Sequence, residues 1–153
     1  MVDIVDTATR SRMMSGIKGK DTKPEMVIRK MLHAAGFRYR LHDKRLSGKP
    51  DLVLPKYRTV IFVHGCFWHG HSDCSLFRLP GTRQQFWSEK IGGNVKRDTV
   101  HVDTLIQSGW KVGIVWECAV KGKGRIDPLA LQRMLEGFIC DPDRPFEEIR
   151  AQC

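Results

Sequence analysis

The sequence lacks the features of membrane, exported and disulfide-stabilised proteins. No apolar run approaches the roughly 20 residues of a membrane-spanning helix. Residues 1–12 contain Asp and Arg side chains and no apolar segment of the kind that a signal peptide needs. The five cysteines are an odd number, which does not suit a disulfide framework. We therefore expect a cytoplasmic protein with reduced cysteines and no membrane partner.

Acidic residues are also scarce. The chain has 17 Asp and Glu against 26 Lys and Arg, which gives a formal net charge of +9. Most of the excess lies in residues 1–50, which contain 12 basic and 5 acidic residues. Such a distribution favours a polyanionic partner, most often a nucleic acid, although a solvated basic surface would give the same count.

Internal repeats and low-complexity tracts are absent, and 153 residues fit a single domain. The segment Thr22-Lys23-Pro24-Glu25 is a capping box that starts a predicted helix ending before Gly36. Hydrophobic periodicity predicts the remaining elements: strands over 37–42, 51–54, 59–63 and 110–116, a helix over 86–108 with a break at Gly92-Gly93, and a last helix capped by Asp127-Pro128.

The order of these elements predicts an α/β fold. Three early strands favour an antiparallel meander, and the long helix then returns the chain to a further strand, which gives a mixed central sheet flanked by helices. We expect residues 1–20 to form a basic N-terminal arm, 21–140 the folded domain and 141–153 a flexible tail.

A long segment without predicted secondary structure, residues 64–85, is rich in Gly, His and Cys. A loop of this length in a compact domain usually serves a function or binds a metal. It contains Cys66, His71 and Cys74, and Cys118 ends a distant predicted strand. Three thiolates and one imidazole form a complete tetrahedral shell for one Zn²⁺, closed to water and hence structural. The alternative is that they are ordinary core cysteines.

One acidic residue stands at the start of a predicted strand. Mg²⁺ nucleases hold the hard cation with carboxylate and carbonyl oxygens from neighbouring strands. Here Asp51 precedes one strand, but the acid-x-Lys triplet expected on the next is replaced by Phe62-Val63-His64. By itself Asp51 would more often be a turn or capping residue.

Three of the six histidines, His64, His69 and His71, fall within eight residues. If His71 binds zinc, His64 and His69 remain available for proton transfer or for positioning water. The alternative is that all three are interchangeable zinc ligands.

Two pairs of adjacent aromatic residues, Phe67-Trp68 and Phe86-Trp87, lie in the loop and at the start of the long helix. Neighbouring side chains point in different directions, so both members of a pair are rarely buried. On a basic protein such residues are candidates for stacking on bases or wedging between them. The alternative is that they pack on the metal-bound loop.

Taken together, these motifs resemble the very-short-patch-repair (Vsr) DNA mismatch endonucleases. The resemblance runs in order from about residue 8 to 140. The segments that carry it are Arg10-Ser11-x-x-Met14-x-x-Ile17, Gly48-x-Pro50-Asp51, His64-Gly65-Cys66-Phe67-Trp68-His69-Gly70-His71, Cys74, Thr82-Arg83, Phe86-Trp87-x-x-Lys90-Ile91, Asn94-x-x-Arg97-Asp98 and Trp116-Glu117-Cys118.

The resemblance implies the fold of the type II restriction enzymes and a strand-nicking activity. The enzyme would cut 5′ of the thymine in a T·G mismatch that arises when 5-methylcytosine deaminates, and the cut would start very-short-patch repair. The implied partners are double-stranded DNA with a T·G mismatch and a functionally linked cytosine-5 DNA methyltransferase. The sequence leaves contact with general mismatch-repair proteins open. The chain is expected to be a monomer.

The resemblance also implies roles for single residues. Asp51 and the main-chain carbonyl of Val63 would bind Mg²⁺, as two ions, and His69 would transfer a proton while Asp98 orients it. His64 and Glu25 would hold metal-bound waters. Zinc would be held by Cys66, His71, Cys74 and Cys118, with His69 as the alternative to His71. The implied DNA-binding residues are Met14 from the minor groove, Phe67, Trp68 and Trp87 from the major groove, and Lys90 and Asn94.

Two other functions fit parts of the pattern. A zinc-stabilised DNA-binding module without catalysis would need neither Asp51 nor a spare His69. A basic RNA-binding protein would explain the charge alone.

Overall fold

The computed structural model describes residues 21–151 of the chain. The predicted arm, residues 1–20, which includes Met14, lies outside the described residues. The elements are α2 (Lys23–Ala34), β1 (Arg40–Leu41), β2 (Leu52–Leu54), β3 (Thr59–His64), α3 (Gln84–Gln107), β4 (Lys111–Trp116), α4 (Pro128–Cys140) and β5 (Phe146–Ile149), with short 3₁₀ turns η1 (Pro55–Tyr57) and η2 (Glu117–Ala119).

The strands form one five-stranded mixed sheet in the order β1-β2-β3-β4-β5. The predicted antiparallel meander of β1, β2 and β3 is confirmed. The crossover through α3 then makes β4 parallel to β3, as a right-handed helical return does in α/β proteins. The prediction of a mixed sheet flanked by helices is therefore confirmed.

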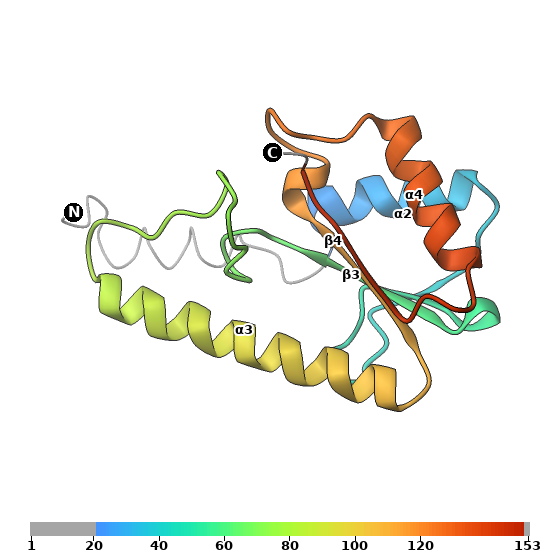
Figure 1. Ribbon diagram of the computed structural model, residues 1–153, viewed down its shortest axis with the longest axis horizontal. Coiled ribbons are helices and arrows are strands. Elements are labelled where there is room, and N and C mark those ends of the chain that lie inside the picture. The colour runs from blue at the N-terminus through green and yellow to red at the C-terminus, as the bar shows by residue number, and fades with distance from the viewer. Residues whose placement is uncertain (1–20, 152–153) are drawn as a thin grey trace.

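Helices cover both faces of this sheet (Figure 1). On one face α2 and α4 pack through residues such as Ile28, Leu32 and Leu135, which join Ile61 of β3 in one apolar cluster. On the other face α3 contributes Leu105 to a second cluster with Val60 and Phe62 of β3. Because side chains alternate along a strand, His64 continues the Val60–Phe62 series and belongs to the α3 side.

Both predicted caps are present. The Thr22 hydroxyl accepts a hydrogen bond from the Glu25 main-chain N–H at 3.3 Å, and the Glu25 carboxylate accepts one from the Asp21 N–H at 3.0 Å. The Asp127 carboxylate accepts from the N–H groups of Leu129 and Ala130 at the start of α4. These caps satisfy main-chain donors that have no partner inside the first turn of a helix.

Three predictions about the elements were wrong. The strand expected over 37–42 is only two residues long, Arg40–Leu41. The expected break at Gly92-Gly93 does not occur, since α3 runs continuously from 84 to 107. Two glycines cost about 2 kcal/mol relative to alanine. Burial of Ile91 and Leu105 against the rest of the protein opposes that cost.

The third difference concerns the segment expected to be a flexible tail. Residues 146–149 form β5, which pairs in parallel with β4 along four residues. Its sequence, Phe-Glu-Glu-Ile, has the charged centre that is common in edge strands and that hides them from hydrophobic-pattern analysis. Within the described residues, no helix is long and apolar enough to cross a membrane.

Candidate active site and metal centre

Asp51 lies beside the C-terminal end of β3. The antiparallel register pairs Leu52 with Ile61, so the residue before β2 reaches the last residues of β3. There an oxygen of the Asp51 carboxylate accepts a hydrogen bond from the Val63 N–H at 2.7 Å. This bond fixes the side chain next to the segment that the sequence analysis paired with it. The predicted role of the Val63 carbonyl as a ligand stays a prediction.

Glu25 of α2 approaches the same place. It is only 1% exposed. Burial raises the pKa of Asp51 to about 7, and repulsion from Glu25 adds to the rise, while the hydrogen bond from Val63 opposes it. A divalent cation between such carboxylates would offset both unfavourable effects, so this pair has the donor chemistry that Mg²⁺ prefers.

A pair of histidines, His64 and His69, lies at the end of β3, where His64 directly follows Val63. His69 comes from the loop after β3, and its Nδ1 is 2.7 Å from an oxygen of Asp98 on α3. The predicted partnership of these two residues is therefore present. The contact fixes the orientation of the imidazole through its Nδ1, so its Nε2 is the ring nitrogen that this bond does not use.

His64 stacks flat on His69, with ring centroids 3.7 Å apart and an angle of 1° between the planes. Burial lowers the pKa of His64 to about 3, and the neighbouring His69 adds to this, so His64 is neutral at physiological pH. Its buried Nδ1 has no hydrogen-bond partner among residues 21–151. A buried polar atom without a partner is costly. A metal-bound water beside it would remove that cost.

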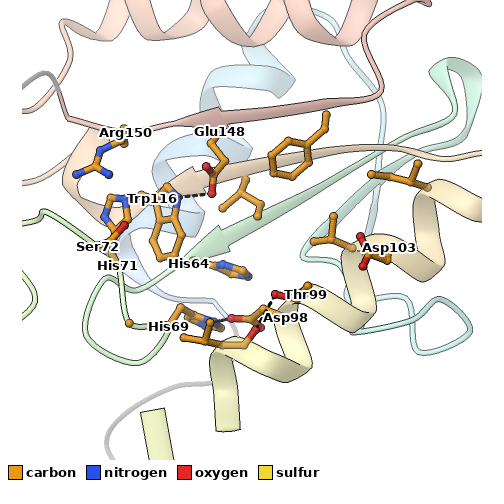
Figure 2. Close-up of a pocket in the computed structure, with 16 residues that line it drawn as sticks. His64, His69, His71, Ser72, Asp98, Thr99, Asp103, Trp116, Glu148 and Arg150 are labelled. Atoms are coloured by element: carbon orange, nitrogen blue, oxygen red, sulfur yellow. Dashed lines mark hydrogen bonds and ion pairs between the residues drawn. The ribbon is translucent and has the colours of Figure 1, made fainter. Parts of the chain in front are cut away.

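A cavity of about 570 Å³ opens beside the two histidines, between α3 and strands β4 and β5. Figure 2 shows His64, His69 and Asp98 on one side and Trp116, Glu148 and Arg150 on another. The Trp116 indole N–H donates to Glu148 at 3.4 Å. The residues of β5 that sequence analysis assigned to a tail thus line the space next to the histidine pair.

The predicted metal cluster also assembles. One ligand atom each from Cys66, His71, Cys74 and Cys118 lies within 4.8 Å of the other three. Four ligands at zinc distances would lie about 3.5–3.8 Å apart, so a small contraction completes a shell. His71, not His69, joins the cysteines, with its Nδ1 3.6 Å from the Cys118 sulfur. Packing of ordinary core cysteines would not require this convergence.

Short-range contacts fold the loop into this shape. The His71 N–H donates to the Cys66 carbonyl, and Gly70 adopts a φ of +60°, which favours glycine. The His71 ring stacks on Trp116 at 3.8 Å. Burial raises the pKa of the Cys66 and Cys118 thiols, so as thiolates they would need a balancing cation.

Sequence analysis missed a contribution from the C-terminal segment. The Ala151 N–H donates to the Cys118 sulfur at 3.3 Å, and the Arg150 guanidinium donates to the Asp73 carbonyl at 2.8 Å. These contacts fasten the end of β5 to the metal cluster. No side-chain motif could have revealed them, because a main-chain N–H and a main-chain carbonyl take part.

The loop and helix aromatics form one cluster. Phe67, Trp68 and Trp87 meet edge to face, with centroid distances of 5.1 Å, 5.6 Å and 5.9 Å. All three are half-buried, so they brace one another yet keep exposed surface. Phe86 is 44% exposed, and the Arg83 guanidinium lies over its ring at 4.4 Å.

One face of α3 contacts three separate parts of the site: the aromatic cluster, His69 and the turn before Asp51. Asn94 donates to the Trp68 carbonyl at 2.9 Å, and Asp98 contacts His69. His101 contacts the Ser47 hydroxyl at 2.8 Å, in the turn that precedes Asp51. Positions 94, 98 and 101 share one side of a helix. Asn94, predicted to bind DNA, therefore has a contact within the protein, whereas Lys90 is exposed.

The chain is an α/β protein with a mixed sheet, a buried carboxylate pair and a cluster of three cysteines and one histidine that could hold a metal ion. The chain belongs to the DNA mismatch endonuclease Vsr family, whose model matches residues 2–76. The DNA mismatch endonuclease Vsr of Escherichia coli is 47% identical over 140 residues, which cover 92% of this chain and 89% of that protein.

Proteins described as type II nicking enzymes are also similar. V.NmeAIP of Neisseria meningitidis serogroup A is 51% identical over 123 residues, covering 80% of this chain and 87% of the relative. V.XorIIP of Xanthomonas oryzae pv. oryzae is 42% identical over 127 residues, covering 83% and 93%. The resemblance inferred from the motifs is thereby confirmed along most of the chain.

Proposed function

We propose that this chain is a Mg²⁺-dependent DNA endonuclease. It nicks one strand 5′ of the thymine in a T·G mismatch and so starts very-short-patch repair. The observation that carries the proposal is that two groups meet consecutive residues at the end of β3: the Asp51 carboxylate accepts from the Val63 N–H, and His69, held by Asp98, stacks on His64. The names of the relatives, a DNA mismatch endonuclease and several nicking enzymes, support it.

In this proposal Asp51 and the Val63 carbonyl would hold two Mg²⁺ ions, and Glu25 and His64 would hold the waters around them. When bound, Mg²⁺ neutralises charge on the phosphate and activates water for in-line attack. The chain's own residues supply orientation and proton transfer. Asp98 fixes Nδ1 of His69, so the free Nε2 exchanges a proton with the attacking water or the leaving oxygen. The Nδ1 of neutral His64, which has no partner among residues 21–151, would be available to a bound water.

The four-ligand cluster serves as a structural zinc site. Three thiolates and one imidazole suit Zn²⁺ and leave no open position for a reacting water. The loop from 65 to 83 has few buried apolar residues of its own, which makes metal bonds its main source of rigidity. Because Phe67, Trp68 and His69 lie between Cys66 and His71, the same ion orients the aromatic cluster and the proton-transfer residue.

The aromatic cluster and α3 form the surface that meets mismatched DNA. Phe67, Trp68 and Trp87 enter the duplex as a wedge, with Lys90 and Asn94 beside them on α3. The arm, residues 1–20, contacts the DNA from the other groove through Met14. Opening a base stack costs a few kcal/mol, and less where pairing is already poor, so the wedge favours a T·G site.

The proposal has three further parts, which concern the fold, the origin of the substrate and the oligomeric state. The folded domain, which β5 extends to residue 149, has the restriction-endonuclease fold, which the antiparallel meander and the helical crossover of the sheet support. A cytosine-5 methyltransferase creates the sites at which the substrate arises. The enzyme acts as a monomer.

Nicking of an end-labelled T·G duplex tests the proposal. Wild-type protein with MgCl₂ should cut only the strand that carries the thymine, and EDTA should stop the reaction. Asp51→Ala should lose nicking yet keep mismatch binding, because it removes a metal ligand and no wedge. A protein that shifts the duplex in a gel and never cuts it would instead be a DNA-binding module. Preference for RNA competitor would point to an RNA-binding protein.

A further inference from the structure

His42, a residue to which sequence analysis gave no role, lies between the two carboxylates of the candidate metal site. Its Nε2 is 2.8 Å from one oxygen of Glu25 and 3.9 Å from one oxygen of Asp51. Its main-chain N–H also donates to the Asp51 carbonyl at 3.1 Å. His42 thus touches the side chain of one acid and both the side chain and the main chain of the other.

Burial and backbone conformation both fix the position of the His42 side chain. The His42 side chain is 19% exposed, and Glu25 is 1% exposed. The His42 backbone has a φ of +48°, in the left-handed region that most side chains avoid and that Asn, Asp and His tolerate best. This conformation turns the chain out of β1 and directs the imidazole back toward α2.

The contact also fixes the tautomer. An ionised carboxylate only accepts hydrogen bonds, so opposite an ionised Glu25 the proton of this 2.8 Å contact is on Nε2 of His42. The second oxygen of Glu25 accepts from the Asp21 N–H at 3.0 Å. Asp21, His42 and the Arg29 guanidinium therefore all hold Glu25, which cannot rotate away from Asp51 without losing a hydrogen bond.

His42 could alternatively bind a metal together with Glu25 and Asp21, since one ligand atom of each lies within 4.8 Å of the others. The guanidinium of Arg29 argues against this, because it lies 2.7 Å from Asp21 and 3.4 Å from Glu25. A cation already occupies that side of the acids. His42 therefore acts as a hydrogen-bond donor to Glu25 and not as a metal ligand.

We infer that His42 is a positioning residue that holds the Glu25 and Asp51 carboxylates in the arrangement a divalent cation requires. The inference rests on the proposed function, because it takes the Asp51 site as the Mg²⁺ site. Without the imidazole, Glu25 would lose the donor on the side that faces Asp51. The cation would then have to order the two carboxylates itself, which weakens its binding while the histidine pair and the aromatic cluster stay intact.

Three substitutions separate the side chain's donor role from its backbone role. His42→Ala removes the donor. His42→Asn keeps a residue type that accepts positive φ but is too short to reach Glu25. His42→Gln places an amide N–H near the position of Nε2. His33→Ala, which removes an exposed histidine from the last turn of α2, is the matched control.

The first measurement is the single-turnover nicking rate of a T·G duplex as a function of MgCl₂ concentration. His42→Ala and His42→Asn should raise the half-saturating concentration about tenfold, the worth of one hydrogen bond to a charged group. His42→Gln should restore most of it, and the rate at saturating Mg²⁺ should stay near that of wild type. The second measurement needs no activity: the rise in melting temperature that MgCl₂ gives the free protein should shrink in the Ala and Asn variants.

Affinity for the T·G duplex without Mg²⁺ should be the same in all variants. An unchanged Mg²⁺ dependence in His42→Ala, a Gln variant no better than Ala, or a loss confined to the saturating rate would each overturn the inference. Asp51→Ala separates it from the proposed function. If Asp51→Ala still nicks at the wild-type rate, the metal site itself is misplaced, whatever His42 does.

Discussion

The contact between His69 and Asp98 makes the most direct prediction about catalysis. Asp98→Asn keeps the size of the side chain but replaces a carboxylate with an amide. The 2.7 Å contact joins half-buried groups, and a hydrogen bond to a charged group contributes about 1.5–3 kcal/mol. If that energy orients His69 in the transition state, its loss lowers the rate about 10- to 150-fold, since each 1.36 kcal/mol is a factor of ten.

The assay is single-turnover nicking of a T·G duplex at saturating Mg²⁺, alongside binding of the same duplex without metal. Asp103→Asn is the control, because Asp103 also lies on α3 and lines the same cavity but is exposed. We expect Asp98→Asn to lose rate and keep affinity, and Asp103→Asn to change neither. A rate for Asp98→Asn within about twofold of wild type, or equal losses in both variants, would refute the orienting role.

The other predictions concern zinc, recognition and packing. Purified protein should contain one zinc per chain, and Cys118→Ser should lower both zinc content and melting temperature while Cys140→Ser, at an exposed cysteine, should not; metal analysis that finds no zinc in active protein would contradict this. Trp68→Ala should reduce affinity for T·G more than for matched duplex, whereas Lys90→Ala should weaken both alike and flatten the salt dependence. Equal losses on both duplexes for Trp68→Ala would mean that the ring only packs the loop. Gly113→Ala should destabilise the fold by about 1–3 kcal/mol in urea unfolding, because its Cβ would lie 2.9 Å from the Phe138 ring; unchanged stability would mean that Phe138 moves freely.

The parts of the site that sequence predicted are those with local or chemically distinctive signals. Cys66, His71 and Cys74 are close in sequence, and three thiols beside a histidine have few common uses other than a metal. Spacing alone could not separate His69 from His71, because both lie in one loop and only its fold directs one inward. The His69–Asp98 pair spans 29 residues and came from the family resemblance rather than from any pattern.

The parts that sequence missed depend on main-chain geometry or on single residues without a motif. The central glutamates of β5 hide its pairing, yet Ala151 reaches the Cys118 sulfur through its N–H. His42 is one histidine after a weak strand, and its role follows from a positive φ that sequence does not encode strongly. Gly92-Gly93 predicted a break that packing on either side of the pair prevents.

The cysteine–histidine cluster and the proposed catalytic residues are connected through the loop after β3 and through α3. His69 and His71 are two residues apart, so a metal bound at His71 limits how far the His69 backbone can move. Asp98 fixes the His69 ring from α3, and Asn94 fixes the Trp68 carbonyl from the turn before. His101, one turn further along α3, contacts Ser47, four residues before Asp51.

Helix α3 therefore contacts the aromatic cluster, His69 and the turn that precedes Asp51. If Trp68 inserts into a mismatch, any displacement of Trp68 would be passed to Asn94 on α3. The same helix carries Asp98, which orients His69. Distance along a helix is fixed at about 1.5 Å per residue, so seating at one end sets the position of the other. The helix runs unbroken through Gly92-Gly93 between Trp87 and Asp98. In the proposed function, α3 would therefore couple binding of the mismatch at Trp68 to the position of His69.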